Sequence, residues 1–598
     1  MPFLGAQLRI DRWRGFCWAV CGLAFPTLAL AADAPLKLSV YATASGVNRY
    51  LNTADGRERA VGALRHLGIT KIFLEGRRGD AYVSPDTLRV VRDYFVERGV
   101  QVSGGIATVP GASFGVRQNE RLGWLNYEAE KTQRDMAQFF AENAAVFDEL
   151  IIDDFYCTAD TSPESQQARG GRSWGQYRQD LLVSLLERMI VQPARGARPT
   201  VRLIQKFPQW YDRFQMFGYD PARMPAAFDR IWVGTEVRNP KTRRMGFVQP
   251  TEGYFNYRWL AAAIGPKVQG AWFDHIESTP QNFLDQAYQS VLAGARELTL
   301  FNLGDVIEGH GGHELLVAAW PELVDLAGKV KGRSPKGIAY YKPPGSDGDE
   351  NLYLMDYLGM IGLPIVPAAH YPGEARVAIL GVQAAGDPQL LDCVRRHLAR
   401  GATLVCTPAL VRRLGSGAAE MAGVGVSGEA EPGAASEVEF GGRRITLETP
   451  LEVDLGLTSE AAAVRVTASA SGRRIPLVTA HAQGAGRVLV WNVRTFSEQD
   501  FLEGSERLLA PKPLGLPEMP RALVDELRGV LLEPLGIRLA GPTQVGFYLL
   551  GDAECFYNFL DRRVDIALNG KRLSLGPNQL VWQQGVKTAG AISIEAAP

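Results

Sequence analysis

Residues 35–330 alternate short apolar runs with amphipathic segments. Eight runs rich in β-branched and other apolar residues predict strands at 37–42, 69–76, 100–107, 149–156, 200–207, 229–236, 268–276 and 297–305. The segments between them place apolar residues at helical spacing, as at 281–295 and at 85–99, where Gly99 stands at a C-cap position. Eight strands alternating with helices over about 300 residues predict a (β/α)8 TIM barrel.

The fourth predicted strand runs into two adjacent aspartates. In the stretch DELIIDDFYCT at 148–158, Asp153 and Asp154 follow an apolar run at 150–152. Chemistry in a TIM barrel lies at the C-terminal ends of the strands. Because consecutive strand residues point to opposite faces, one aspartate is expected to face the barrel mouth and the other the loop or the next helix. The pattern does not choose between them.

Carboxylates also follow the sixth and seventh predicted strands. Glu236 ends the sixth, and Asp274 the seventh. Glycoside hydrolysis needs two carboxyl groups beside the scissile bond: one donates a proton to the leaving oxygen, and the other attacks the anomeric carbon or activates water. The predicted catalytic residues are Asp153, Asp154, Glu236 and Asp274.

Other residues at the strand ends suit the binding of a sugar, because rings stack on its C–H faces and charged or amide groups bind its hydroxyls. These predicted substrate-binding residues are Tyr41, Glu75, Tyr156, Lys206, Trp210, Arg238, Trp272, Glu277 and Asn302. Lys206 could also lower the pKa of a neighbouring carboxylate through its charge. For each residue taken singly, the alternative is a structural role as a helix cap, an ion-pair partner or a core aromatic.

Two short motifs favour loops rather than binding sites. In HGGHE at 310–314, two glycines separate His310 from His313, and no HxH follows the first strand as in the barrel-type metal hydrolases. We therefore predict a loop near the mouth and no metal or other cofactor. The stretch GRRGD at 76–80 is interpreted as a loop after the second strand.

The chain changes its pattern after the barrel. Strand-like and helical runs alternate over 336–415 in a doubly wound βαβ order without a GxGxxG loop, so no dinucleotide is indicated. A polar β insertion is predicted at about 416–480, and the α/β domain ends near 538. Short alternating runs over 540–598 predict a small antiparallel β domain.

Composition narrows the class of protein. With 598 residues, several domains are expected, and a formal net charge of -1 argues against a nucleic-acid partner. Residues 1–31 have the pattern of a secretory signal: Arg9, Arg12 and Arg14 precede an apolar run at 16–30 that ends in Ala29-Leu30-Ala31. We expect an exported protein, periplasmic or extracellular, with no membrane span after cleavage. Of the four cysteines beyond this segment, Cys393 and Cys406 are the pair that could form a disulfide; buried free thiols are favoured.

The order of the domains carries a resemblance to a known family. A (β/α)8 barrel, a glutamine-amidotransferase-like α/β domain and a small β domain resemble the family 42 β-galactosidases, whose α/β domain is a trimerisation domain without amidotransferase chemistry. The segments IIDDFY, RSWGQYR (172–178), KFPQWYD (206–212) and VGTEVR (233–238) also look like exported bacterial barrel proteins related to glycoside hydrolases. By analogy, the chain could form homo-oligomers through its α/β domain.

The site pattern departs from that family. The β-galactosidases carry a glutamate acid/base, typically after Asn, following strand four and a glutamate nucleophile after strand seven, whereas this chain has Asp153-Asp154 and then Asp274. An aspartate after strand four with Glu236 after strand six resembles the α-galactosidase-like barrels instead. The resemblance implies an exported glycoside hydrolase acting on an oligo- or polysaccharide. The alternative is a non-catalytic glycan-binding or scaffold protein with a degenerate barrel.

Overall fold

The computed structural model describes residues 34–243, 246–503 and 508–584. The predicted signal segment at 1–31 lies outside the described residues. No helix in the described ranges is both long enough and apolar enough to cross a membrane.

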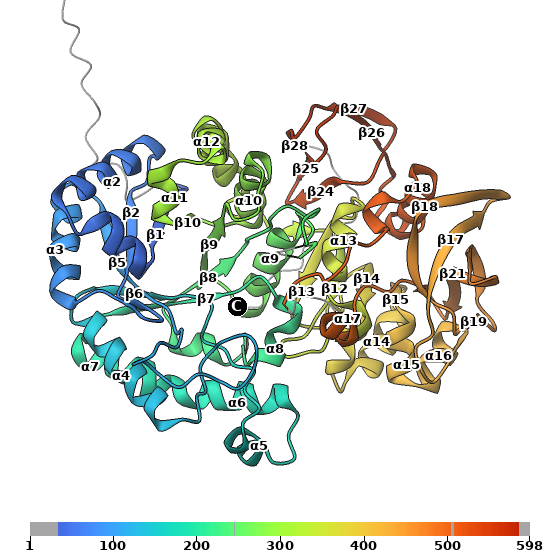
Figure 1. The fold of residues 1–598 in the computed structure, drawn as a ribbon. Helices are drawn as coiled ribbons and strands as arrows, with labels where there is room; N and C mark the ends of the chain where they lie inside the picture. Colours follow the sequence, from blue (N-terminus) through green and yellow to red (C-terminus); the bar gives the residue numbers. More distant parts are fainter. Residues whose placement is uncertain (1–33, 244–245, 504–507, 585–598) are drawn as a thin grey trace, which may run out of the picture. The chain divides into compact units, whose positions relative to one another are not determined.

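Eight parallel strands close into the predicted barrel, in the order β1-β10-β9-β8-β7-β6-β5-β2 (Figure 1). They are β1 Lys37–Ala42, β2 Lys71–Glu75, β5 Gln101–Ile106, β6 Glu149–Ile152, β7 Arg202–Phe207, β8 Arg230–Gly234, β9 Val268–Asp274 and β10 Glu297–Phe301. Each corresponds to one of the eight apolar runs, and most are shorter than the run. The TIM barrel predicted from the sequence is therefore confirmed.

Helices surround the strands where the amphipathic segments predicted them (Figure 1). They include α2 Ala54–Leu67, α3 Pro85–Val96, α4 Glu130–Ala144, α6 Trp174–Leu186, α9 Glu252–Ile264, α10 Pro280–Ala293 and α12 Gly311–Val330. Helix α3 begins where the Ser84 side chain accepts a hydrogen bond from the Thr87 amide, and it buries Leu88, Val91 and Phe95. Between β7 and β8 there are only short elements: the 3-10 turn Tyr211–Arg213, helix α8 Phe214–Phe217 and the 3-10 turn Met224–Ala227.

Alternation along the strands sets what faces the inside of the barrel. The inward residues form an aromatic and aliphatic layer: Tyr41, Phe73, Ile151, Ile204, Trp232 and Trp272, with Phe301 packed against it. Because side chains alternate with a period of two, the next inward position after Ile151 is Asp153, and after Ile204 it is Lys206. The apolar layer thus forms a floor beneath the charged residues of the mouth.

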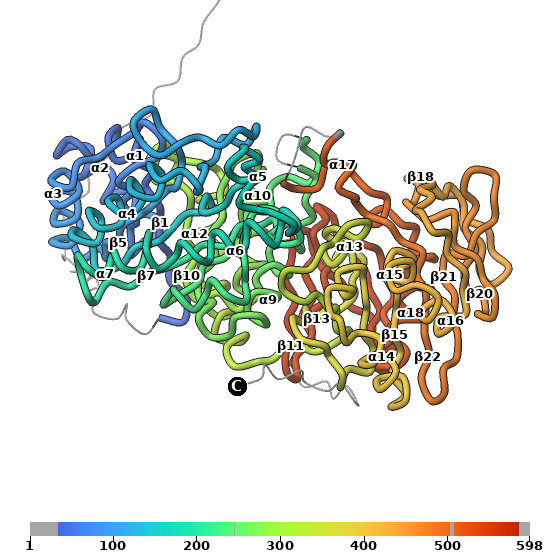
Figure 2. Tube along the Cα trace, turned by 90° about the horizontal axis from the view of Figure 1, so that it is seen from below, coloured from blue at the N-terminus to red at the C-terminus, as the bar shows by residue number. Residues whose placement is uncertain are grey.

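The second part of the chain is built on one nine-stranded sheet, in the order β13-β12-β14-β15-β22-β21-β20-β17-β18. The parallel strands are β13 Ile365–Ala368, β12 Ile338–Tyr341, β14 Val377–Leu380, β15 Thr403–Cys406 and β22 Gly486–Trp491, and the antiparallel ones are β21 Arg473–Gln483, β20 Ala463–Ala470, β17 Pro432–Phe440 and β18 Arg443–Asp454. Figure 2 shows β20, β21 and β22 side by side. The predicted β insertion begins with a helix, α16 Ser416–Ala422, and its longer strands extend the α/β sheet.

The last part of the described chain contains the predicted antiparallel β structure. One sheet joins β11 Pro335–Lys336, β24 Val545–Leu550, β25 Ala553–Asn558 and β28 Leu580–Gln584, and a second joins β23 Leu539–Ala540, β26 Val564–Leu568 and β27 Lys571–Leu575. Strand β11 belongs to the first sheet although it directly follows the barrel in the sequence. Helices α13 Leu354–Met360, α14 Leu390–Ala399, α15 Pro408–Leu414 and α18 Arg521–Leu532 complete the fold.

Candidate active site

Lys206 lies at the centre of the barrel mouth because it continues the inward-facing positions of β7. Its Nζ lies 2.8 Å from both Asp154 Oδ2 and Glu236 Oε1, and 3.5 Å from Asp153 Oδ1. The same nitrogen lies 4.6 Å from the centre of the Trp272 ring below it. Three of the four predicted catalytic carboxylates, from β6 and β8, therefore meet around one buried ammonium group.

Asp153 is the inward aspartate, and both of its carboxylate oxygens accept hydrogen bonds. Oδ1 accepts from the Asp154 amide at 2.8 Å, and Oδ2 accepts from Arg78 Nη2 at 2.5 Å. Burial alone would raise the pKa of Asp153, but the charges of Lys206 and Arg78 outweigh it and lower the pKa to about 2. Asp153 is therefore an ionised partner that fixes Lys206 and Arg78.

Asp154 and Glu236 are held less completely. The side chain of Asp154 is 10% exposed and that of Glu236 7% exposed, so both border the mouth. Burial and the nearby charges of Asp153 and Glu236 raise the pKa of Asp154 to about 7, against the opposing charge of Lys206. Burial also raises the pKa of Glu236, although Lys206 and Arg238 act in the other direction.

Gln209 joins Glu236 to a second ion pair. In the amide orientation that satisfies both of its polar atoms, the Gln209 nitrogen donates to Glu236 Oε2 at 2.7 Å and its oxygen accepts from Arg238 Nη1 at 3.2 Å. Arg238 in turn makes two hydrogen bonds to Asp274, at 3.0 and 2.6 Å. Asp274 is thus held by a bidentate guanidinium pair.

The mouth holds more acids than bases. Five carboxyl groups and three cations form one connected network: Glu75, Asp153, Asp154, Glu236 and Asp274 with Arg78, Lys206 and Arg238. In a buried environment this excess favours proton uptake, because uncompensated charge is costly there. The pKa of Asp154, which burial raises to about 7, agrees with a network that retains a proton at this residue.

Three of the predicted substrate-binding residues are buried inside the barrel. Tyr41 and Glu75 are both fully buried, and the Tyr41 hydroxyl donates to Glu75 Oε1 at 2.6 Å. The Trp272 ring belongs to the same floor, 4.7 Å from the Tyr41 ring. Tyr41 and Trp272 thus belong to the apolar floor below Lys206, whereas Glu75 is the next inward position after Phe73 and pairs with Arg78.

Two more aromatic predictions are corrected by packing. Tyr156 is fully buried, and its hydroxyl donates to the Leu182 carbonyl on α6 at 2.7 Å, so it joins the layer between barrel and helices. Trp210 is 6% exposed and stacks on Trp124 at 6.4 Å. Both residues follow a strand end in sequence: Tyr156 is anchored to helix α6, and Trp210 packs on another loop of the same face.

The last two predicted binding residues lie in loops. Asn302 caps helix α11 Leu303–Glu308, where its side chain accepts from the Gly304 amide at 2.8 Å. Glu277 is partly exposed in the loop after β9 and has a backbone φ of 53°. Asn302 therefore has the helix-cap role that was the alternative reading.

The histidine motif begins a helix. The His310 side chain accepts from the Gly312 amide at the start of α12, and His313 lies one turn further on. Burial lowers the pKa of His313 to about 4, with the neighbouring imidazoles acting in the same direction. Within the described ranges, no group of three or more His, Cys, Asp or Glu side chains has metal-binding geometry. The four cysteines in these ranges, including Cys393 and Cys406, are free.

Sequence reasoning missed three residues of the site. Arg78 comes from the GRRGD loop, which forms the hairpin β3 Arg77–Arg78 and β4 Ala81–Tyr82 and turns this guanidinium onto Glu75 and Asp153. Its position three residues after the strand-end Glu75 could have indicated that it belongs to the site. For Gln209, the sequence offers no such indication. Glu252, at the start of α9, is fully buried with no hydrogen-bond partner in the described part of the chain, and burial raises its pKa well above normal.

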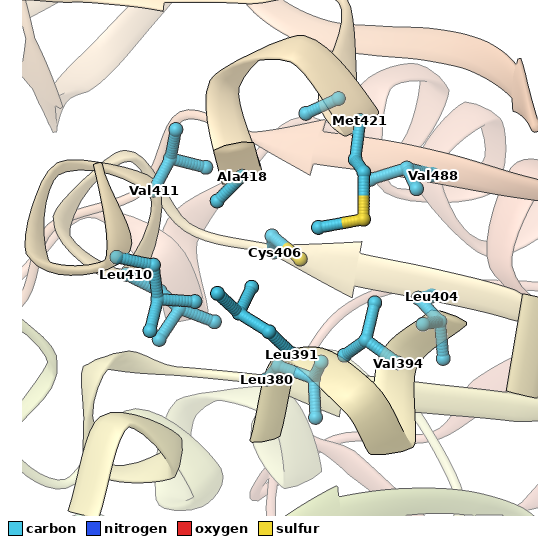
Figure 3. Close-up of a pocket in the computed structure, with 12 residues that line it drawn as sticks. Leu380, Leu391, Val394, Leu404, Cys406, Leu410, Val411, Ala418, Met421 and Val488 are labelled. Carbon is cyan, nitrogen blue, oxygen red and sulfur yellow. The ribbon is translucent and has the colours of Figure 1, made fainter. Parts of the chain in front are cut away.

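A separate pocket lies in the α/β domain and has a different character. Its lining is aliphatic with one thiol, and Leu391, Cys406, Leu410 and Met421 are among the side chains that face it (Figure 3). No charged side chain lines it, so it offers nothing to activate a bond. The chemistry of the molecule is therefore concentrated at the barrel mouth.

Comparison with known proteins relates the barrel region to glycosyl hydrolases. Residues 26–317 match the family model described as "Probable glycosyl hydrolase, catalytic domain". Residues 334–431 match the second domain of the uncharacterized protein SSO3021. That protein, from Saccharolobus solfataricus, is 24% identical over 426 residues, which cover 65% of this chain and 69% of the relative.

Solved structures share the whole architecture at low sequence identity. The family 42 β-galactosidase Gan42B from G. stearothermophilus superposes with a TM-score of 0.61 at 12% identity, covering 92% of this chain and 99% of its own. A β-galactosidase from Bacillus circulans sp. alkalophilus has a TM-score of 0.60 at 12% identity and covers 92% of this chain and 98% of its own. The α-L-fucosidase isoenzyme 2 from Paenibacillus thiaminolyticus has a TM-score of 0.60 at 11% identity and covers 89% of this chain and 93% of its own. The chain thus has a family 42-like architecture, and its barrel region matches the model of a probable glycosyl hydrolase catalytic domain, which confirms the resemblance of fold.

Proposed function

We propose that this protein is a glycoside hydrolase in which Asp154 is the general acid and Glu236 the nucleophile. The observation that carries the proposal is the position of Lys206 between the two carboxylates at the C-terminal ends of β6 and β8. Both side chains border the mouth of a barrel that matches a glycosyl hydrolase catalytic domain. Two carboxyl groups on one opening supply what cleavage of a glycosidic bond requires.

The roles follow from the hydrogen bonds that each carboxylate accepts. Glu236 accepts from Lys206 and from the Gln209 amide, and both bonds favour its ionised form. Asp154 accepts from Lys206 and stands beside the ionised Asp153, which favours the protonated form and a pKa of about 7. A carboxyl group that keeps its proton near neutral pH can deliver it to the leaving oxygen.

The spacing favours retention of anomeric configuration. Because Asp154 Oδ2 and Glu236 Oε1 each lie 2.8 Å from the same nitrogen, these two oxygens can be separated by no more than twice that distance. Retaining enzymes keep their carboxyl groups about 5–5.5 Å apart, whereas inverting enzymes need about 6.5–9.5 Å to admit a water molecule. The proposed pair fits the shorter class.

The proposed substrate is an oligo- or polysaccharide met outside the cytoplasm. Its carbohydrate nature is supported by the activities named for the structural relatives, which include β-galactosidase and α-L-fucosidase. The relatives differ in sugar and in anomer, so the shared fold selects neither. Export rests on the signal-like sequence at 1–31, and self-association rests on the likeness of the α/β domain alone.

The experiment is a glycan screen on the chain without residues 1–31, followed by single substitutions. Asp154→Asn and Glu236→Gln should each lower kcat/KM on the substrate found by roughly a hundredfold to ten-thousandfold, because each removes a proton donor or nucleophile. The anomer released first, followed by NMR, should match that of the substrate.

A matched control is available on the same strand. Asp148 lies just before β6 at the opposite end of the barrel and is 77% exposed, so Asp148→Asn makes the same chemical change away from the mouth and should keep parental activity. Full activity in both Asp154→Asn and Glu236→Gln would refute the proposed pair. Glycan binding without turnover in the parent would instead support a binding or scaffold protein.

A further inference from the structure

The loop at 208–213, called here the β7 loop, connects the proposed catalytic centre with the α/β domain. It begins two residues after Lys206 and carries Gln209, which contacts Glu236. It continues through Tyr211 and Asp212, whose side chains are buried against residues of the second domain. One short segment of chain therefore touches both the mouth of the barrel and its neighbour.

The second domain holds this loop with a buried ion pair. Asp212 Oδ1 lies 3.2 Å from Lys342 Nζ, and both side chains are 1% exposed. Asp212 Oδ2 accepts from the Tyr353 amide at 2.7 Å and from Gln383 Nε2 at 3.2 Å. Buried charges with this number of partners have one favourable arrangement, so they fix the position of the loop.

A hydrogen bond between side chains adds a second attachment. The Tyr211 hydroxyl donates to Asp356 Oδ1 at 2.8 Å, from the loop to helix α13. Burial, with Asp212 close by, raises the pKa of Asp356 well above normal, and the Tyr211 hydrogen bond opposes this. Removal of the Tyr211 hydroxyl would loosen the loop while leaving the ring in its packing.

At its other end, the β7 loop lies against Glu236. A Cβ atom added to Gly234 would lie 2.8 Å from Glu236 Oε2 and 3.1 Å from the backbone nitrogen of Gln209. Glu236 therefore turns back onto the β7 loop with little space between them. A shift of Gln209 would remove a hydrogen bond from Glu236 and change how the carboxylate faces Lys206.

We propose that the α/β domain positions the Glu236 carboxylate, through the β7 loop, for the glycosidase reaction. Tyr211 and Asp212 are then positioning residues that act through Gln209. This inference rests on the proposed function for its catalytic consequence, while the attachment of the loop can be measured without turnover. It gives the second domain a role in the chemistry of the barrel.

The test is Tyr211→Phe beside a matched control, Tyr557→Phe. Tyr557 also donates from outside the barrel to a buried carboxylate, Asp285 Oδ1 on α10 at 2.5 Å, but it does not touch the β7 loop. Tyr211→Phe should lower kcat roughly tenfold with little change in KM, because small displacements of reacting groups are costly. The acidic limb of its kcat/KM profile should move to higher pH, since Glu236 loses a hydrogen bond to its ionised form. Tyr557→Phe should change neither quantity.

A second variant tests whether Tyr211 acts on Glu236 through Gln209. Gln209→Ala removes the contact with Glu236 directly, and adding Tyr211→Phe to it should cause no further shift of the acidic limb. The proposal is overturned if the full Tyr211→Phe shift persists in the Gln209→Ala background. It is equally overturned if Tyr211→Phe keeps parental kcat and pH dependence, or if Tyr557→Phe matches its effect.

A measurement without substrate separates this inference from the proposed function. The amides of Tyr211 and Arg213 donate to the carbonyls of Gln209 and Trp210 at 2.8 and 2.9 Å, so hydrogen exchange reports on the loop. Exchange at 208–213 should be faster in Tyr211→Phe than in the parent and in Tyr557→Phe. If no glycan is turned over, the proposed function fails, whereas unchanged exchange overturns the attachment by the second domain.

Discussion

Burial and the neighbouring charges at the barrel mouth shift the pKa values of two adjacent aspartates in opposite directions. Asp153 faces inward, accepts from Arg78 and lies near Lys206, and its pKa falls to about 2. Asp154 shares Lys206 with Glu236, and its pKa rises to about 7, with burial as the largest cause. Neighbouring residues on one chain thus supply a fixed charge and a proton donor, as environment rather than residue type decides.

The raised pKa of Asp154 has a consequence for stability. Between pH 4 and 7 the folded chain keeps a proton that the unfolded chain has released, so stability contributed at this site is lost as pH rises through that window. Asp154→Asn removes the titration and should flatten the fall of the free energy of unfolding from pH 4 to 7. The effect is on the order of a few kcal/mol and is measured by urea denaturation across this range.

Asp153 provides the opposite pH dependence within the same molecule. Its lowered pKa contributes stability above about pH 4 that is lost as pH falls toward 2, and Asp154→Asn should leave this acid loss in place. The exposed substitution Asp148→Asn should leave the pH 4 to 7 slope as it is in the parent. A slope in Asp154→Asn equal to the parental one would assign the pH dependence to another group.

The limits of sequence reasoning are visible at single residues. The convergence of Asp153, Asp154 and Glu236 followed from strand ends alone, because parallel strands deliver their C-terminal residues to one rim. Tyr156 and Trp210 followed strand ends equally well, yet Tyr156 packs against helix α6 and Trp210 against Trp124. Which way a loop residue turns depends on the helices and loops it packs against, and no local pattern encodes that.

At the scale of elements, the buried pair of Lys342 and Asp212 joins the α/β domain to the barrel. Lys342→Met should destabilise the chain by about 3–5 kcal/mol, because it leaves the Asp212 carboxylate buried without its cation. Adding Asp212→Asn should restore much of that loss, since the remaining amide carries no charge. Guanidinium denaturation of the parent, both single variants and the double variant measures the coupling.

An exposed ion pair serves as the control for the comparison of the Lys342 and Asp212 variants. Arg89 and Asp86 pair at 2.6 Å on the surface of α3, with the aspartate 93% exposed, and removing either should cost less than about 1 kcal/mol. A Lys342→Met loss as small as this would mean that water reaches Asp212. Full additivity of the two buried substitutions would mean that they do not interact.

Strands were predicted better than the sheets they form. All eight barrel strands matched apolar runs, and β12, β13, β14 and β15 lie in the stretch at 336–415 predicted to alternate strands and helices, because burial on both faces leaves a continuous apolar signal. The insertion was predicted as β structure, but its extension of the parallel sheet through β21 beside β22 was not. Pairing partners far apart in sequence are set by register and packing, which a run of residues does not specify.

At the scale of the whole molecule, side chains of the barrel pack into the core of the later domains. Helix α9 directs three buried aromatic residues outward: Trp259 donates to the Lys342 carbonyl at 2.8 Å, and the Tyr254 ring lies 4.7 Å from that of Tyr548. Phe255 packs against helix α13, where a Cβ atom on Gly359 would lie 2.4 Å from its ring. These contacts make the later domains part of the core that the barrel needs.

A barrel cut free at residue 332 should therefore fail to fold as a soluble monomer. Exposing three aromatic side chains of 150–250 Å² each would cost on the order of 10 kcal/mol at about 25 cal/mol per Å², an upper bound similar to the net stability of a domain. Residues 35–332 should aggregate on size-exclusion chromatography and lack a cooperative transition by circular dichroism, whereas residues 35–598 show both a single species and a transition. Replacing Phe255 and Trp259 with glutamine in the truncated chain should recover solubility.

A truncated barrel that is monomeric, unfolds cooperatively and hydrolyses the substrate of the full chain would show that the later domains are dispensable for both the core and the chemistry.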